Sequence, residues 1–192
     1  EIYTLSLHDA LPISISKRSL MEKIVVNDTN IFIDLYKIGL LEEMFSLPWE
    51  IHTTRLVLVE IIREGQLESV NQYVTDGRLH IPVLSETEMK TIAEMKLEYS
   101  TKTNVSITDC SVWYYALKNK FTLLTGDRKL KSISALDGVE VHGTIYIFDK
   151  MVEHKILTPA MAADKLELLY RINHRFPKSE IDQRIKLWRS SH

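Results

Sequence analysis

Four acidic residues stand at points of the sequence where metal-dependent hydrolysis could be carried out. Asp28 and Asp127 each follow a short apolar run of the kind that forms buried strands. Asp109 begins an aromatic-rich segment, and Glu60 lies in a segment with apolar residues on both sides. Four carboxylates gathered in one place repel one another unless a cation neutralises them. Because hard divalent ions prefer oxygen ligands, Mg²⁺ or Mn²⁺ is the ion that such a set would hold.

Each of these acids also has an ordinary structural interpretation. Asp28, Asp109 and Asp127 stand where helices are expected to begin, and an Asp at such a position stabilises a helix by about 1 kcal/mol. Glu60 is harder to explain in this way, because its apolar neighbours predict burial and a buried Glu seldom lacks a partner. Both interpretations stay open for the single residues, and the set of four favours a metal site.

The segments around the acids alternate short β-branched runs with longer amphipathic ones. Strands are expected at residues 23–27, 50–54, 78–83, 121–125 and 139–142. Helices are expected at residues 30–38, 40–45, 55–74 with an interruption at Gly65, 85–99, 106–120, 127–136, 144–153, 159–172 and 179–189. This alternation predicts an α/β fold of three layers, α/β/α, with a parallel central sheet and a helical C-terminal extension. Ligands of such sheets bind at the carboxyl ends of the strands.

Local signals refine this outline. Pro82 cannot donate a backbone hydrogen bond, so its strand is expected at an edge of the sheet. Ser85 and Glu88 have the spacing of a capping box, and Thr53 or Thr54 is expected to cap the helix that follows them.

Composition narrows the class of protein. The 192 residues are 45% hydrophobic, with 24 Lys and Arg against 26 Asp and Glu. A single cysteine excludes a disulfide framework and a Cys-rich zinc site, and no run approaches the roughly 18 apolar residues of a membrane span. We therefore expect a cytoplasmic protein without a membrane partner. Residues 150–192 are basic, with nine Lys and Arg against five Asp and Glu, which suits a segment that attracts phosphate.

Residues 22 to about 145 resemble the PIN-domain ribonuclease family. The resemblance is carried by the segments 25–31 (VVNDTNI) and 124–130 (LTGDRKL), together with Glu60 and the pair Thr108-Asp109. It implies that Asp28, Glu60, Asp109 and Asp127 are catalytic and hold Mg²⁺ or Mn²⁺. Thr125 matches a polar position common beside the last acid of the family, and Asn30 belongs to the Asp-Thr-Asn motif, so both are supporting candidates. Asp34, six residues beyond Asp28, is a further, weaker supporting candidate.

The function implied by the resemblance is a metal-dependent endoribonuclease that hydrolyses RNA phosphodiester bonds. Arg128, Lys129 and Lys131 follow the last acid and are candidates to contact substrate phosphates, with ordinary solvated charges as the alternative. The family also includes toxins of toxin–antitoxin pairs, so an antitoxin protein and a second copy of the chain are candidate partners besides RNA.

Two other functions compete with this one. A PIN-like RNA-binding or interaction module without catalysis would not need the full set of four acids. A phosphatase of the haloacid-dehalogenase kind would need Asp-x-Asp after the first strand, whereas this chain has Asp28-Thr-Asn30.

The expected organisation has three parts. Residues 1–13 resemble a translated sequencing adapter, so residues 1–20 are expected to be an artefactual leader outside the domain. Residues 21–145 are the expected PIN-like catalytic domain. Residues 146–192 are expected to pack as a helical extension on that domain or on a dimer partner, because they carry apolar residues at helical spacing.

Overall fold

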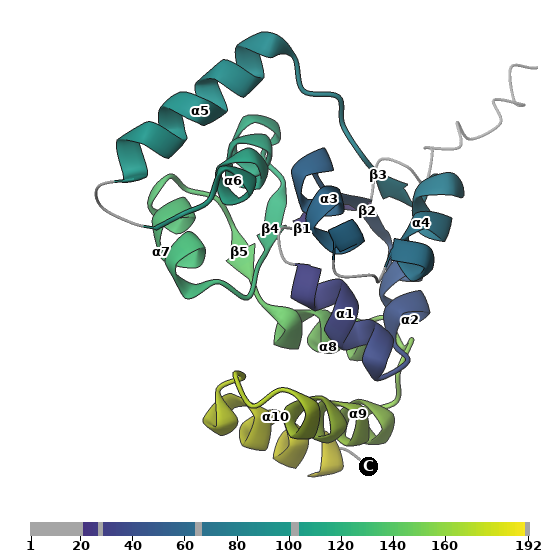
Figure 1. The fold of residues 1–192 in the computed structure, drawn as a ribbon. Helices are drawn as coiled ribbons and strands as arrows, with labels where there is room; N and C mark the ends of the chain where they lie inside the picture. The colour runs from purple at the N-terminus through teal and green to yellow at the C-terminus, as the bar shows by residue number, and fades with distance from the viewer. Residues whose placement is uncertain (1–20, 27–28, 64–66, 101–103, 191–192) are drawn as a thin grey trace, which may run out of the picture.

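A computed structural model describes residues 21–26, 29–63, 67–100 and 104–190, and the expected leader at residues 1–20 lies outside them. Within the described residues, five strands form one parallel sheet in the order β3-β2-β1-β4-β5 (Figure 1). The strands are β1 (Glu22–Val26), β2 (Trp49–His52), β3 (Leu79–His80), β4 (Thr122–Leu124) and β5 (Val141–His142). The helices are α1 (Thr29–Lys37), α2 (Leu41–Phe45), α3 (Arg55–Arg63), α4 (Leu67–Thr75), α5 (Glu86–Ser100), α6 (Ile107–Asn119), α7 (Arg128–Leu136), α8 (Thr144–Glu153), α9 (Pro159–Ile172) and α10 (Lys178–Ser190).

The central strands are apolar on both faces because helices cover both. Ile24, Val25 and Val26 of β1 are fully buried, as are Leu123 and Leu124 of β4. Helix α6 packs against β1 and β4, while Figure 1 shows α1, α2 and α8 on the opposite side of the sheet. This arrangement confirms the predicted three-layer α/β/α fold with its parallel central sheet.

The edges of the sheet follow the local signals in the sequence. β3 is an edge strand, as Pro82 predicted, but it is limited to two residues instead of the expected six. Ser85 and Glu88 form the expected capping box: the Ser85 backbone N–H donates to Glu88 Oε2 at 2.7 Å, and the Glu88 backbone N–H donates to Ser85 Oγ at 3.3 Å. Gly138, with φ of +80°, provides the left-handed residue after α7 from which the chain turns toward β5.

Two groups of helices surround this sheet. Helix α5 packs on α6 over a small second apolar cluster made of Ile92, Val105 and Cys110. Helices α9 and α10 pack on each other, and α9 also contacts α8. Leu166, Leu169 and Trp188 of this C-terminal pair are buried in the same apolar cluster as the central strands. None of the helices in the described part of the chain has the length and apolar character that crossing a membrane requires.

Candidate functional site

The order of the strands defines a switch point at β1. The chain moves from β1 to β2 and β3 on one side and returns to place β4 and β5 on the other. Val26 and Leu124 are register partners, so the carboxyl ends of β1 and β4 are neighbours. Asp28 follows the first of these strands in the sequence, and Asp127 follows the second. Open parallel sheets bind their ligands at such a point.

Glu60 and Asp109 are brought together by the contact between α3 and α6. The Thr108 hydroxyl donates a hydrogen bond of 2.7 Å to Glu60 Oε1, so the Glu60 carboxylate is bonded to the residue that precedes Asp109 in the sequence. The Asp109 carboxylate accepts from the Ser106 backbone N–H at 2.7 Å, and its own backbone N–H donates to Ser106 Oγ at 2.9 Å. Asp109 therefore closes a capping box at the start of α6, as its structural interpretation predicted, and it directly follows the residue that bonds Glu60.

A chain of buried hydroxyls supports this pair of acids. Thr54 Oγ1 and Ser111 Oγ are 2.8 Å apart, and Ser111 Oγ donates to the Thr108 carbonyl at 2.7 Å. Thr53 Oγ1 donates to the Val26 carbonyl at 2.7 Å, and this bond joins the carboxyl end of β2 to that of β1. The two Thr hydroxyls expected to cap α3 therefore bond to β1 and α6, and the sequence pattern did not reveal this role.

Asp127 is the N-cap of α7, as its structural interpretation predicted. Its Oδ1 accepts from the backbone N–H groups of Lys129 at 2.6 Å and Leu130 at 3.0 Å. Within the described part of the chain Oδ2 accepts no hydrogen bond, so one oxygen of this exposed carboxylate can still serve a ligand. Thr125 is buried, and its Oγ1 accepts from the Asp127 backbone N–H at 3.1 Å, which fixes the turn.

The fourth predicted acid, Asp28, lies outside the described residues. Among the residues that are described, no three His, Cys, Asp or Glu side chains form a group able to hold a metal ion. Glu60, Asp109 and Asp127 nevertheless offer carboxylate oxygens, the donor chemistry that suits Mg²⁺ and Mn²⁺. Cys110 next to Asp109 offers no alternative nucleophile, because burial of its thiol raises the pKa to about 11.

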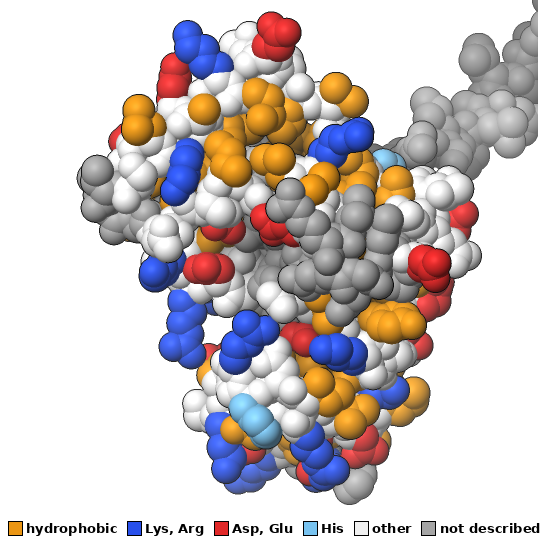
Figure 2. Space-filling model, in the orientation of Figure 1, with side chains coloured by type: hydrophobic (Ala, Val, Ile, Leu, Met, Phe, Trp, Pro, Cys, Tyr) orange, Lys and Arg blue, Asp and Glu red, His pale blue; other side chains and the backbone are white. Residues whose placement is uncertain are grey.

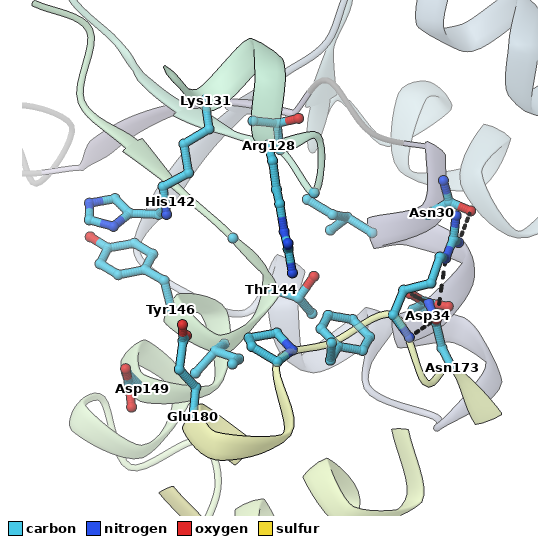
Figure 3. A pocket seen from close by; sticks show the side chains of 18 of the residues that line it. Asn30, Asp34, Arg128, Lys131, His142, Thr144, Tyr146, Asp149, Asn173 and Glu180 are labelled. Carbon is cyan, nitrogen blue, oxygen red and sulfur yellow. Dashed lines mark hydrogen bonds between the residues drawn. The ribbon is translucent and has the colours of Figure 1, made fainter. Parts of the chain in front are cut away.

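A cavity of about 610 Å³ opens beside the switch point (Figure 3). It is lined by residues that follow β1, β4 and β5, including Asn30, Asp34, Thr125, Arg128 and Lys131. The basic residue Lys129 is exposed and is not part of the lining, so the structure places only two of the three candidate phosphate contacts in the cavity.

The C-terminal extension supplies the opposite wall of this cavity. Asn173 Nδ2 donates to Asp34 Oδ2 at 3.0 Å, and an Arg175 guanidinium nitrogen donates to Asn30 Oδ1 at 3.3 Å. Both bonds join the segment between α9 and α10 to α1. Figure 2 shows Lys and Arg side chains spread over the part of this face where α9 and α10 lie. Asn30 and Asp34, predicted as supporting residues, therefore line the cavity and contact the extension.

Comparison with known proteins places this geometry in a family. A family model described as a PIN domain, DUF3368, matches residues 24–190 and so includes the extension. A search of curated proteins gives no match. Among solved structures, VapBC2 from Rickettsia felis bound to a DNA fragment from its promoter is similar at 20% identity and a TM-score of 0.44, with 63% of this chain and 98% of that chain covered.

Proposed function

The chain belongs to the PIN-domain family, and we propose that it is a metal-dependent endoribonuclease that hydrolyses RNA phosphodiester bonds. The observation that carries the proposal is the hydrogen bond from Thr108, the residue before Asp109, to Glu60 at the contact of α3 and α6. A Glu fixed in this way has a preset rotamer, which a metal ligand requires and a surface charge does not.

In this proposal Asp28, Glu60, Asp109 and Asp127 hold Mg²⁺ or Mn²⁺. The ion supplies stabilisation of the charge on the scissile phosphate and a bound water of lowered pKa. The protein supplies the positions: Thr108 orients Glu60, the Ser106 backbone orients Asp109, and Thr125 fixes the turn that presents Asp127. Arg128 and Lys131 attract the phosphate backbone to the same edge of the sheet.

A cleavage assay on mixed single-stranded RNAs with Mn²⁺, Mg²⁺ or EDTA tests the proposal. We expect cleavage with either ion and none with EDTA, and a loss of more than about 100-fold in Asp109→Asn and Glu60→Gln. Glu94→Gln is the matched control, because Glu94 is an exposed carboxylate on α5 that is not one of the four proposed ligands and does not line the cavity. Full activity in both site variants would contradict the nuclease proposal.

The alternative is a catalytically inactive PIN-like RNA-binding or interaction module. It predicts RNA binding that EDTA leaves unchanged and no cleavage under any of the three conditions, so the same assay separates it from the nuclease. A role as the toxin of a toxin–antitoxin pair, an antitoxin partner, a homodimer and a cytoplasmic location stay predictions from the sequence.

A further inference from the structure

Thr144 is a buried polar residue whose hydroxyl faces the cavity. It is the first residue of α8, is only 5% exposed and lines the cavity (Figure 3). Within the described residues its hydroxyl makes no hydrogen bond, and the hydroxyl oxygen is still reached by solvent. The hydroxyl therefore opens to the cavity, where water or the oxygen of a ligand can serve as its hydrogen-bond partner.

The start of α8 favours an anion as that ligand. Gly143 is the N-cap, and no side chain caps the first amides of the helix; the Tyr146 N–H bonds the Gly143 carbonyl at 3.1 Å, and no such bond is formed by the amides of Thr144 and Ile145 within the described residues. The positive end of the helix dipole lies at the same place, and phosphate groups bind at such termini.

The charges around the cavity agree with an anion. Within the described residues, Arg128 and Lys131 form no ion pair, and Arg175 bonds only the amide oxygens of Asn30 and Asn173. Figure 3 shows Arg128 pointing into the cavity toward Thr144.

The acids of the lining balance this charge only in part. Asp34 accepts from Asn173, and Asp149 pairs with Arg184 at 2.9 Å. Glu180 is exposed and also lines the cavity. Because neither Asp34 nor Asp149 pairs with Arg128 or Lys131, these two cations of α7 stay available to a ligand.

We infer that Thr144, with Arg128 and Lys131, forms a phosphate-binding subsite for one phosphodiester of an RNA strand next to the cleaved bond. The inference rests on the proposed nuclease function for the identity of the strand. Its position fits because Thr125 and Gly126, which line the same cavity, directly precede Asp127. The family resemblance carried by the acids did not point to Thr144, and the other two members of the subsite, Arg128 and Lys131, both lie on α7.

RNA binding measured in EDTA, where no cleavage is expected, tests the subsite. The probe is a fluorescein-labelled single-stranded RNA of about 12 nucleotides, titrated with the full chain in EDTA and followed by anisotropy. We expect Thr144→Val to weaken binding about fivefold, and Arg128→Ala about tenfold. Thr144→Ser keeps the hydroxyl and should bind within about twofold of wild type. Arg128→Ala should also reduce the slope of log affinity against log salt by about 0.7.

Lys186→Ala is the matched control, because it removes one exposed positive charge from α10 outside the cavity. Thermal melts establish that each variant is folded. Wild-type affinity in both Thr144→Val and Arg128→Ala, equal losses in Thr144→Val and Thr144→Ser, or no RNA binding by the wild type would overturn the subsite. If the variants behave as expected but the wild type cleaves no RNA, the subsite stands and the nuclease proposal fails.

Discussion

On the α3–α6 side of the sheet edge, the Thr108 hydroxyl donates to Glu60 at 2.7 Å, and the hydroxyls of Ser111 and Thr54 continue the chain of bonds behind it. On the α8 side, within the described residues, the equally buried Thr144 hydroxyl bonds nothing. Both regions place a Thr near the start of a helix at the same edge of the sheet. They differ in whether the protein itself satisfies the hydroxyl.

The difference separates two tasks of a binding site. Ligands of a metal ion must be held in one geometry before the ion arrives, and the bonded chain behind Glu60 does this. A site for an RNA strand gains affinity when groups without protein partners form bonds to phosphate. The side chains of Thr144, Arg128 and Lys131 are such groups within the described residues. In the functions proposed above, the α3–α6 region would fix the ion and the α8 region would attract the substrate.

The largest effect that would sharpen this comparison is expected for Thr108→Val. The variant keeps the shape of the side chain but frees Glu60, and the loss of such a supporting bond lowers metal affinity or activity about 10- to 100-fold. Titration with Mn²⁺ by calorimetry and RNA binding in EDTA measure the two tasks separately. Unchanged Mn²⁺ affinity, or weaker RNA binding in EDTA, would show that the two regions do not divide the work in this way.

The next effect concerns stability at the same place. Ser111→Ala removes the fully buried hydroxyl that bonds both Thr54 and the Thr108 carbonyl, so it leaves two buried groups without this partner. We expect the free energy of unfolding to fall by about 1 to 3 kcal/mol in urea melts.

Thr144→Val is the matched comparison, since it removes a hydroxyl that bonds nothing in the described structure. Its stability should stay the same or rise slightly. A larger loss in Thr144→Val than in Ser111→Ala would reverse the assignment of the two regions.

Local patterns in the sequence predicted most of the fold. The apolar run of β1, the capping box of Ser85 and Glu88 and the helix cap at Asp127 depend on neighbours within a few residues, so the chain alone reveals them. β3 was predicted too long, because only its pairing with β2 decides where the strand ends. Glu60 was expected between buried neighbours; of the neighbours whose burial is described, Val57 and Ile61 are fully buried, whereas Val59 is 37% exposed.

The parts of the site that were not predicted depend on contacts across long stretches of chain. The bond between Thr54 and Ser111 spans 57 residues, and the bond from Arg175 to Asn30 spans 145. No periodicity signals such pairs, because a pattern local to one segment carries no information about the distant residue that it bonds. Small polar residues at positions where the pattern demands burial, as at Thr108 and Ser111, are the one signal that could have revealed the hydroxyl chain.

A moderate effect of pH on stability is expected from His52. It tests whether the stability of the α3–α6 side of the sheet edge depends on an uncharged His52 next to Thr53. His52 precedes Thr53 at the end of β2, and burial lowers the pKa of its imidazole. The folded state therefore binds fewer protons than the unfolded state as pH falls below about 6.5, so stability falls there. The slope contributed by one such group is at most about 1.4 kcal/mol per pH unit.

Urea melts between about pH 7 and pH 5 measure this slope, and His52→Gln should flatten it. Glu50, the bonded neighbour of His52, has a lowered pKa and contributes its own loss of stability only below its ordinary pKa near 4.5, so the two windows are separate. An unchanged slope in His52→Gln would assign the acid sensitivity to other groups.

The smallest effect is expected for Lys129→Ala, which tests whether the α8 side is a discrete subsite or a diffuse basic surface. Lys129 and Lys131 lie on the same helix and carry the same charge, but only Lys131 lines the cavity. Lys129 supports Asp127 through its backbone N–H, which donates at 2.6 Å and remains in the variant, so α7 keeps its cap and its stability. We expect anisotropy titrations to show RNA affinity within about twofold of wild type for Lys129→Ala and a severalfold loss for Lys131→Ala, because removing a remote charge weakens only the screened, long-range attraction. Equal losses in the two variants would mean that α7 attracts RNA by its net charge, and the contrast between the two sides of the edge would then rest on Thr144 alone.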